Sequence, residues 1–256
     1  MKAMIFAAGL GTRLRPFTSE HPKALVPVGG VPMLGRVIEN IIRTGVTEVV
    51  VNVHHFAEQV RAYLRDNDNF GLGARLHVSD ESNLLLDTGG GIAHAAHILA
   101  PEGSDEAVLV HNADILTNLP LEDMSESMGA GCDALLLVAD RDSSRRLLFT
   151  PEGIMCGWRN FQTGAVRPQS LTEAQADSAR PMAFGGVHMI SADTVRDIAA
   201  YGRERFGAGE TPFSIMDYYI DRCASRRFGM YVGPDGYLWF DIGRPETLEA
   251  AQKAMK

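Results

Sequence analysis

Short apolar runs alternate with helically spaced apolar residues through the first half of the chain. Continuous runs at 2–7, 48–53, 74–78 and 107–111 are typical of strands buried in a parallel sheet. Between the first two runs, apolar residues share one face of a helix that Gly45 can end: Leu34, Val37, Ile38, Ile41 and Ile42. Further helices are predicted at 57–65 and about 91–99. The order βαβαβαβ predicts a parallel sheet with helices on both faces.

The second half is less regular. Strands are predicted at 134–138, 146–149, 182–190 and 227–232, and ProAspGly at 234–236 predicts a turn before YLWF. The polar stretch 160–180 is interpreted as a loop or flap. A last helix begins near Pro245, with Leu248, Ala251 and Met255 facing inward. Together the two halves predict the α/β class: a Rossmann-like, three-layer α/β/α fold with a mostly parallel central sheet.

Composition and charge narrow the class of protein. The 256 residues are 45% hydrophobic and 22% charged, as in one globular domain, and no apolar run reaches the roughly 20 residues that span a bilayer. The net charge of −8 argues against nucleic acid or a membrane surface as partner. Without a secretion signal, and with three scattered cysteines interpreted as reduced thiols, a cytoplasmic location is expected. The sequence contains no hexapeptide repeat, so a C-terminal β-helix is not expected.

The segment from Met1 to Val28 is the richest in chemistry. Its apolar run breaks at Gly9, and the loop that follows combines glycines, prolines, Arg13 and Lys23, a combination that suits a polyphosphate. Two familiar phosphate motifs do not fit. There is no Gly-Lys-Ser/Thr of a Walker A loop, and Leu14 stands where the dinucleotide fingerprint needs its third glycine. A dinucleotide-dependent oxidoreductase is therefore disfavoured.

The same segment resembles the signature of the sugar-1-phosphate nucleotidyltransferases, GxGTRxxPxT followed by a proline-lysine pair. The matching positions are Gly9, Gly11, Thr12, Arg13, Pro16, Thr18, Pro22 and Lys23. The resemblance implies a GT-A-like fold in which residues 1–115 bind the nucleotide and 116–256 bind the sugar. It also implies that the triphosphate is bound by Ala8, Gly9, Gly11, Thr12, Arg13 and Lys23. Of these, Arg13 and Lys23 are the expected catalytic groups.

Two aspartates that follow strand-like runs are candidate metal ligands. Asp114 stands in HNADI and Asp241 in WFDIGRPE. Carboxylates at the ligand edge of a sheet can hold Mg²⁺ together with water and phosphate oxygens. The alternative is that both aspartates are structural residues of turns or helix caps. The family resemblance, which carries an aspartate in both phrases, favours Mg²⁺ at Asp114 and Asp241.

Two glycine clusters suggest close approach of a ligand to the backbone. Asp87-Thr88-Gly89-Gly90-Gly91 stands before a predicted helix, and the resemblance places Thr88, Gly89 and Gly90 at the nucleotide; the alternative is a flexible loop. Gly185 and Gly186 match an element that lines the sugar pocket in relatives; a β-bulge explains them equally well. Asn112 is expected on the sugar-phosphate side.

The chain departs from the family in one place. Many members carry a Glu-Lys-Pro segment whose lysine binds the sugar phosphate, and this chain lacks it; Arg145, Arg146 or Arg159 could replace that lysine. Two histidine pairs, His54-His55 and His94 with His97, have no third ligand at a zinc spacing, so no zinc site is predicted.

These features predict Mg²⁺-dependent attack of a sugar 1-phosphate on the α-phosphorus of a nucleoside triphosphate, with release of pyrophosphate. Within the family, the compact length, the TGGG element and the HNAD phrase favour UTP and N-acetylmuramate 1-phosphate, as in cell-wall recycling. The alternative is guanylyl transfer to mannose or heptose 1-phosphate. A non-catalytic nucleotide-sugar sensor would be expected to lack a phosphate or metal residue. The expected partners are small molecules, and the sequence does not indicate an oligomeric state.

Overall fold

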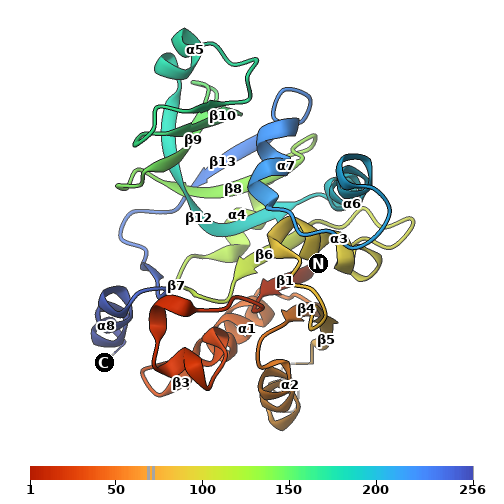
Figure 1. Ribbon diagram of the computed structural model, residues 1–256, viewed down its shortest axis with the longest axis vertical. Helices are drawn as coiled ribbons and strands as arrows, with labels where there is room; N and C mark the ends of the chain where they lie inside the picture. The colour runs from red at the N-terminus through yellow and green to blue at the C-terminus, as the bar shows by residue number, and fades with distance from the viewer. Residues whose placement is uncertain (68–69, 71–72, 256) are drawn as a thin grey trace.

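The computed structural model of the protein describes residues 1–67, 70 and 73–255 (Figure 1). The strands are β1 (Lys2–Phe6), β2 (Pro27–Val28), β3 (Val31–Pro32), β4 (Glu48–Val53), β5 (Arg75–Asp80), β6 (Val108–Asn112), β7 (Ile115–Thr117), β8 (Ala134–Ala139), β9 (Arg145–Phe149), β10 (Met155–Asn160), β11 (Val166–Arg167), β12 (Arg180–Ile190), β13 (Phe228–Val232) and β14 (Trp239–Asp241). The α-helices are α1 (Met33–Arg43), α2 (Ala57–Asp66), α3 (Asp87–Leu99), α4 (Leu121–Glu126), α5 (Glu173–Ser178), α6 (Ala192–Phe206), α7 (Ile215–Arg222) and α8 (Pro245–Ala254). Three short 3₁₀ helices occupy the N-terminal loop: η1 (Thr12–Leu14), η2 (Phe17–Ser19) and η3 (Lys23–Leu25).

Seven strands form the centre of the main sheet, in the order β5-β4-β1-β6-β12-β8-β13. Strand β1 is parallel to β4 and β6, β4 is parallel to β5, and β8 is parallel to β13. Strand β12 is antiparallel to both β6 and β8, so β8 runs in the same direction as β6. All central strands except β12 therefore run one way, which confirms the predicted α/β class with a mostly parallel sheet.

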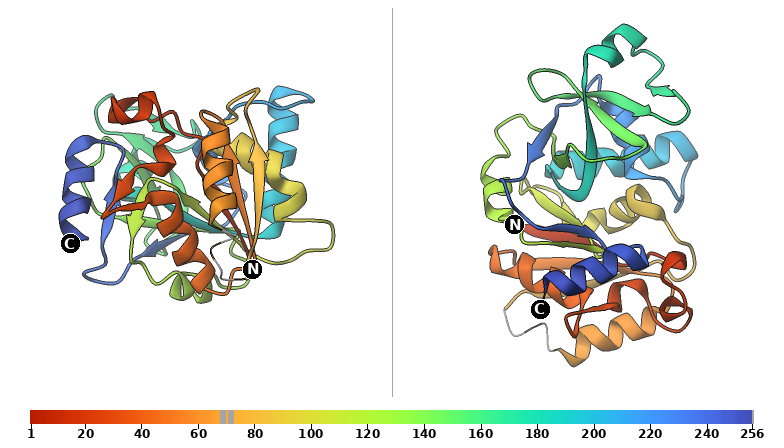
Figure 2. Two further views of the ribbon diagram at one scale, coloured as in Figure 1. Left: turned by 90° about the horizontal axis from the view of Figure 1, so that it is seen from below. Right: turned by 90° about the vertical axis from the view of Figure 1, so that its left-hand side faces the viewer.

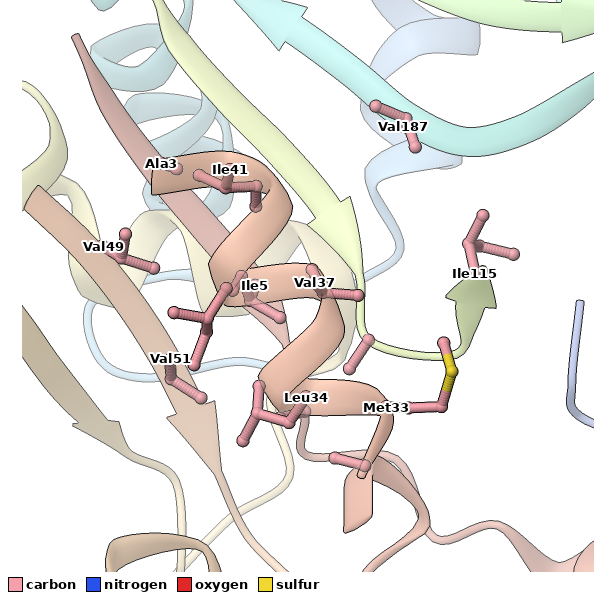
Figure 3. Packing of buried hydrophobic residues seen from close by; sticks show 14 of the residues in the cluster. Ala3, Ile5, Met33, Leu34, Val37, Ile41, Val49, Val51, Ile115 and Val187 are labelled. Carbon is pink, nitrogen blue, oxygen red and sulfur yellow. The ribbon is translucent and has the colours of Figure 1, made fainter. Parts of the chain in front are cut away.

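Helices cover both faces of this sheet (Figure 2). On one face, α1 packs its predicted apolar stripe against β1 and β4; Leu34, Ile38 and Ile41 are fully buried there (Figure 3). Gly45 ends this helix with φ of +81°, as predicted. On the other face, Met4 and Val50 pack against residues of α3, α6 and α7. Alternate residues of β1 and β4 face the helices on opposite sides of the sheet, so both sets of side chains are apolar. The resulting continuous apolar runs made these strands recognisable in the sequence.

The second half adds a small antiparallel sheet to the central one. Strands β11, β10 and β9 pair in that order, and β9 pairs with the first residues of β12. This sheet and α5 lie at the end of the molecule opposite to α2 (Figure 1). Strand β12 is common to both sheets, and its register with β8 shifts between Phe184 and His188.

Three predictions require correction. The stretch 160–180 is not only a loop, because it contains the end of β10, β11 and α5, the last capped by Thr172 and Gln175 in a capping box. Helix α3 begins at Asp87, so the glycine cluster lies within its first turns and not before them. Met255 is 36% exposed, because α8 ends at Ala254, whereas Ala251 is buried as predicted.

Other elements were not predicted at all. The sequence does not predict strands β2, β3, β7, β10 and β11, nor helices α4, α6 and α7. The predicted turn at 234–236 is present, but the strand after it, β14, pairs with β7. No helix in the described ranges is both long enough and apolar enough to cross a membrane.

Candidate active site

A cavity of about 420 Å³ lies at the carboxyl ends of β1, β4 and β6. This is the edge at which open α/β sheets bind ligands. Six of the predicted site residues line it, namely Ala8, Gly9, Lys23, Thr88, Asn112 and Asp114. The remaining lining residues are Phe6, Ala7, Ala24, Asn52, Leu85, Asp87, Ala113 and Pro212.

Lys23 reaches the cavity from η3. Pro22 enters this 3₁₀ helix with extended backbone, at φ −68° and ψ 144°, and the helix follows directly. The ammonium of Lys23 forms an ion pair with Oδ2 of Asp114, which stands between β6 and β7. The side chain of Lys23 is 12% exposed, so its charge faces the cavity from a largely enclosed position.

Gly243 marks the point at which three of the predicted site side chains converge. A Cβ atom built on Gly243 would lie 2.8 Å from Oδ1 of Asp241, 2.9 Å from Nη2 of Arg13 and 3.0 Å from Nζ of Lys23. The structure therefore brings Arg13 of the N-terminal loop and Asp241 near the C-terminus to Lys23, although Arg13 and Asp241 do not line the cavity itself. Gly243 was not predicted as a site residue, although its position two residues after Asp241 was visible in the sequence.

The two predicted metal ligands lie side by side: Asp114 in the turn between β6 and β7, and Asp241 at the end of β14, which pairs with β7. Asp241 is opposite Ile115 in the β14–β7 pair, and the N–H of Ile242 donates to the carbonyl of Asp114 at 3.0 Å. Such a pair of carboxylates fits Mg²⁺, which takes one or two carboxylates and completes its shell with water and phosphate oxygens. No cluster of three or more His, Cys, Asp or Glu side chains suited to a metal occurs among residues 1–67, 70 and 73–255.

Gly11 is required by both backbone and space. Its φ is +62°, and a Cβ there would lie 2.8 Å from both Lys23 Cβ and Thr18 Cγ2. The hydroxyl of Thr18 also donates to the carbonyl of Gly11 at 2.8 Å. These contacts pack the loop around the stem of Lys23, which explains why glycine, threonine and lysine occur at these positions. Thr12 follows on η1, exposed and outside the cavity lining.

Gly89 and Gly90 serve helix packing in this structure. Both N–H groups donate to the carbonyl of Phe213, at 2.9 and 3.2 Å. A Cβ on Gly89 would lie 2.3 Å from the Phe213 ring, and one on Gly90 would lie 2.7 Å from the Thr211 carbonyl. Both glycines are buried away from the cavity lining, which Thr88 does reach. The close packing of α3 on the chain before α7 is the reason that these glycines lie in a helix.

Gly185 and Gly186 lie at the irregular part of β12, so the bulge interpretation is confirmed. Gly186 has φ of +75°, and a Cβ there would lie 3.0 Å from Nδ2 of Asn112 and 2.8 Å from Ile115. Neither glycine lines the cavity described above. Their predicted contact with a sugar stays a prediction, while Asn112 lies between Gly186 and the cavity.

The three arginines proposed to replace the family lysine lie on different faces of the β9–β10 hairpin. Arg146 is within 3.6 Å of Asp140 and Asp142, and Arg159 donates to Asp177 at 2.5 Å. Opposite residues of an antiparallel pair share a face, and Arg146 is opposite Arg159. Arg145 therefore points to the other face.

The histidine pairs take separate partners. The Nδ1 atom of His94 lies 2.8 Å from Oε1 of Glu210, and His54 donates through Nδ1 to the carbonyl of Glu81 at 2.6 Å. His97 is exposed, and its Nδ1 donates to the carbonyl of His94 at 3.2 Å.

Sequence reasoning missed a buried network beneath the cavity. Oδ1 of Asn52 accepts from the N–H groups of Ala7 and Ala8, at 2.7 and 3.3 Å, and its Nδ2 donates to Glu81 at 2.8 Å. Glu81 also accepts from the N–H of Leu86 at 3.1 Å. Burial raises the pKa of Glu81, although these hydrogen bonds act in the opposite direction. The network fixes the end of β1 relative to the start of α3. An asparagine inside the apolar run EVVVNV was the available signal.

Arg141 is a second residue that the sequence did not reveal. Its guanidinium stacks 3.7 Å from the centre of the Trp239 ring and donates to the carbonyl of Phe184. Trp239 in turn donates from Nε1 to the carbonyl of Gly185 at 2.8 Å. Burial lowers the pKa of Arg141. This arrangement ties the β12 bulge to β14, the strand that carries Asp241.

Known proteins share both the sequence and the fold. Residues 2–144 match the family model described as nucleotidyl transferase. The chain is 33% identical over 254 residues to the N-acetylmuramate alpha-1-phosphate uridylyltransferase of Caulobacter vibrioides. This match covers 98% of this chain and 95% of that relative. It is 36% identical over 248 residues to mannose-1-phosphate guanylyltransferase 1 of Arabidopsis thaliana, covering 96% of this chain and 62% of that one.

Solved structures agree on the fold. A putative glucose-1-phosphate thymidylyltransferase from Bacillus anthracis, in complex with a sucrose, superposes with a TM-score of 0.76 at 17% identity. The match covers 100% of this chain and 95% of that chain. The overall fold therefore follows a known architecture.

Proposed function

Because this chain belongs to the nucleotidyl transferase family and is a sugar-1-phosphate nucleotidyltransferase, we propose that it transfers a uridylyl group from UTP to N-acetylmuramate 1-phosphate. The observation that supports this acceptor is the Caulobacter vibrioides relative, which aligns over nearly the whole of both chains. In the proposed reaction a phosphate oxygen of the sugar 1-phosphate attacks the α-phosphorus of UTP in line, and pyrophosphate leaves.

The convergence at Gly243 supports the assignment of roles. Arg13, whose Nη2 lies beside Gly243 and near Lys23, would bind the β- and γ-phosphates through two parallel hydrogen bonds. Lys23 offsets the charge that develops around the α-phosphate, because its ammonium is fixed beside the cavity and need not reorganise during reaction. Backbone N–H groups at Gly9 and Gly11 would add neutral donors to the triphosphate.

Asp114 and Asp241 would hold Mg²⁺, which supplies neutralisation of phosphate charge when bound. The chain's own contribution is to keep these carboxylates close to each other and to Lys23, through the pairing of β14 with β7 and the ion pair of Lys23 with Asp114. Residues 1–115 would then bind the nucleotide, while the sugar contacts would come from 116–256. Asp241 is the exception to this division, because it belongs to the second half of the chain but lies beside Arg13 and Lys23 of the first half.

Guanylyl transfer to mannose 1-phosphate is the second candidate, and the Arabidopsis thaliana relative supports it. The test is a pyrophosphate-release assay with UTP and GTP against N-acetylmuramate 1-phosphate and mannose 1-phosphate, with Mg²⁺. We expect the highest kcat/KM for UTP with N-acetylmuramate 1-phosphate. A higher value for GTP with mannose 1-phosphate would establish the alternative, and no release with any pair would contradict both.

A further inference from the structure

A second cavity, of about 460 Å³, lies between the β9–β10 hairpin and α7. Its volume is in the range of small-molecule sites. The lining combines aromatic side chains with hydroxyl, amide and charged groups: Ser143, Arg145, Leu147, Trp158, Asn160, Arg167, Phe184, Ser214, Met216, Asp217 and Ile220. Such a mixture of flat apolar surface and hydrogen-bonding groups suits a substituted sugar.

The strand register explains which side chains face this cavity. In the β9–β10 pair, Arg145 is opposite Asn160 and Leu147 is opposite Trp158. Opposite residues share a face, and residues two apart on one strand do as well, so these four side chains form one surface. This surface faces α7, which contributes Met216, Asp217 and Ile220 to the lining.

Arg145 gives this cavity a surplus positive charge. Arg167, the other arginine of the lining, is held by α7: its Nη1 lies 2.9 Å from Asp217 and its Nη2 lies 3.5 Å from Asp221. The negative charge of Asp217 is therefore already balanced by Arg167. None of the ion pairs formed within the described ranges includes Arg145, so its guanidinium is free to bind an anion.

The two cavities share a border. Pro212 lines the first cavity, while Ser214 and Met216 line the second, so one short segment borders both. This segment is fixed to the nucleotide side because the N–H of Ile215 donates to the hydroxyl of Thr88 at 2.9 Å. A sugar 1-phosphate with its phosphate at the first cavity could therefore place a ring substituent in the second.

We propose that the second cavity is the subsite for a carboxylate-bearing substituent of the acceptor sugar, bound by Arg145 and packed against Trp158. The inference rests on the proposed function and deepens it, because it names the chemical class of acceptor. N-acetylmuramate carries a lactyl ether that ends in a carboxylate, whereas N-acetylglucosamine has a hydroxyl in its place and mannose has no acidic group. An arginine binds a carboxylate through two parallel hydrogen bonds, and such charge-assisted pairs are strong and selective.

The test compares two acceptors that differ only in the acidic group. N-acetylmuramate 1-phosphate and N-acetylglucosamine 1-phosphate would be assayed with the wild type, Arg145→Gln, Arg145→Lys and Arg180→Gln. Arg180 is an exposed arginine of the same small sheet that does not line the cavity, so its variant is the matched control. We expect Arg145→Gln to raise KM for the acidic sugar at least about tenfold and to leave the neutral sugar unchanged. Arg145→Lys keeps the positive charge but loses the two parallel hydrogen bonds, so it should retain only part of the preference.

Calorimetric binding of the same two sugar 1-phosphates separates this inference from the proposed function. If the wild type makes no nucleotide sugar but binds the acidic sugar through Arg145, the proposed function fails and the subsite stands. If Arg145→Gln weakens both sugars equally, or weakens neither, the subsite is wrong whatever the turnover. Equal wild-type affinity for the two sugars would overturn it as well.

Discussion

Lys23 donates a hydrogen bond from its ammonium to Oδ2 of Asp114, a residue 91 positions later in the chain. Their side chains are 12% and 24% exposed, so the pair is largely shielded from solvent. The contact joins the N-terminal loop, which carries the predicted phosphate-binding motif, to the end of β6. A phosphate that enters the cavity therefore meets a lysine that is already held in place and not one that must be ordered on binding.

Replacing Lys23 by methionine should lower kcat by about 100-fold, because an oriented charge is lost at the reacting phosphate. Pyrophosphate release at saturating substrates measures this. Lys253→Met is the control, since Lys253 is an exposed residue of α8 that pairs with Glu249 in the preceding turn of that helix. A Lys23→Met enzyme with wild-type kcat would contradict the proposed role.

Gly243→Ala should reduce kcat by about tenfold to 100-fold while leaving Tm within a few degrees of the wild type. The added methyl would lie within 3.0 Å of Asp241, Arg13 and Lys23, so the three functional groups must move apart. Gly129→Ala serves as the control, because a Cβ there meets nothing within 4 Å. Kinetics and thermal unfolding on the same preparations would decide; full activity in Gly243→Ala would show that the convergence is unimportant.

Removal of divalent metal with EDTA should abolish turnover, and Mg²⁺ should restore it. In Asp241→Asn, the Mg²⁺ concentration that gives half-maximal rate should rise at least about tenfold, because one of two anionic ligands is lost. Asp235→Asn, in the exposed turn before β14, should titrate like the wild type. The proposed metal ligands are wrong if the two variants require the same Mg²⁺ concentration.

Gly89→Ala should lower the free energy of unfolding by about 1–3 kcal/mol, because its methyl overlaps the Phe213 ring. Phe213→Val removes the overlapping ring atoms, so the double variant should lose less stability than the sum of the two single variants. Urea unfolding of all four proteins measures the coupling. Additive losses would mean that Gly89 is needed for a reason other than packing against Phe213.

Stability should fall as pH drops below about 6.5. Burial lowers the pKa of His111 to about 4 and that of His188 to about 3, so both stay neutral in the folded state. The unfolded chain takes up these protons near pH 6.5, and each histidine then costs about 1.4 kcal/mol per pH unit until its folded pKa is reached. Urea unfolding at several pH values checks this.

The control for this pH dependence is His188→Asn, which cannot take up a proton. Its free energy of unfolding should fall less steeply between pH 6 and pH 5 than that of the wild type. The slope should decrease by nearly the contribution of one proton, and protonation of His111 in the unfolded chain should account for the slope that remains. Equal slopes would mean that His188 is protonated in the folded protein.

The parallel half of the fold was predictable because burial on both faces forces continuous apolar strands. β1, β4 and β6 carry that pattern, and the stripe from Leu34 to Ile42 identifies α1. The short strands β7 and β11 were not predictable, because two or three residues carry no period. Helix α6 escaped because its buried positions include Thr194, Tyr201 and Gly202, which do not read as an apolar stripe.

The site was predictable where a motif carried it, and less so where tertiary packing decided. Lys23 and Asp114 are paired as the phosphate and metal assignments required them to be close. Gly89 shows the limit: three consecutive glycines before apolar sequence indicate close approach, but the sequence does not say whether a ligand or Phe213 approaches. Asn52 and Arg141 act through partners that are distant along the chain, and no local pattern marks them.

Strands β9, β10 and β11 lie in the sequence between β8 and β12, and β9 pairs with β12 at Arg180–Met182, away from the segment Val187–Ile190 of β12 that pairs with β6. Changes in their length or side chains therefore leave the register of β6, β1 and β4 untouched. The small sheet that lines the second cavity can consequently be varied separately from the strands that end at the first cavity. A library of variants randomised only in β9, β10 and β11 would test new acceptors while the strands at the proposed nucleotide site stay unchanged.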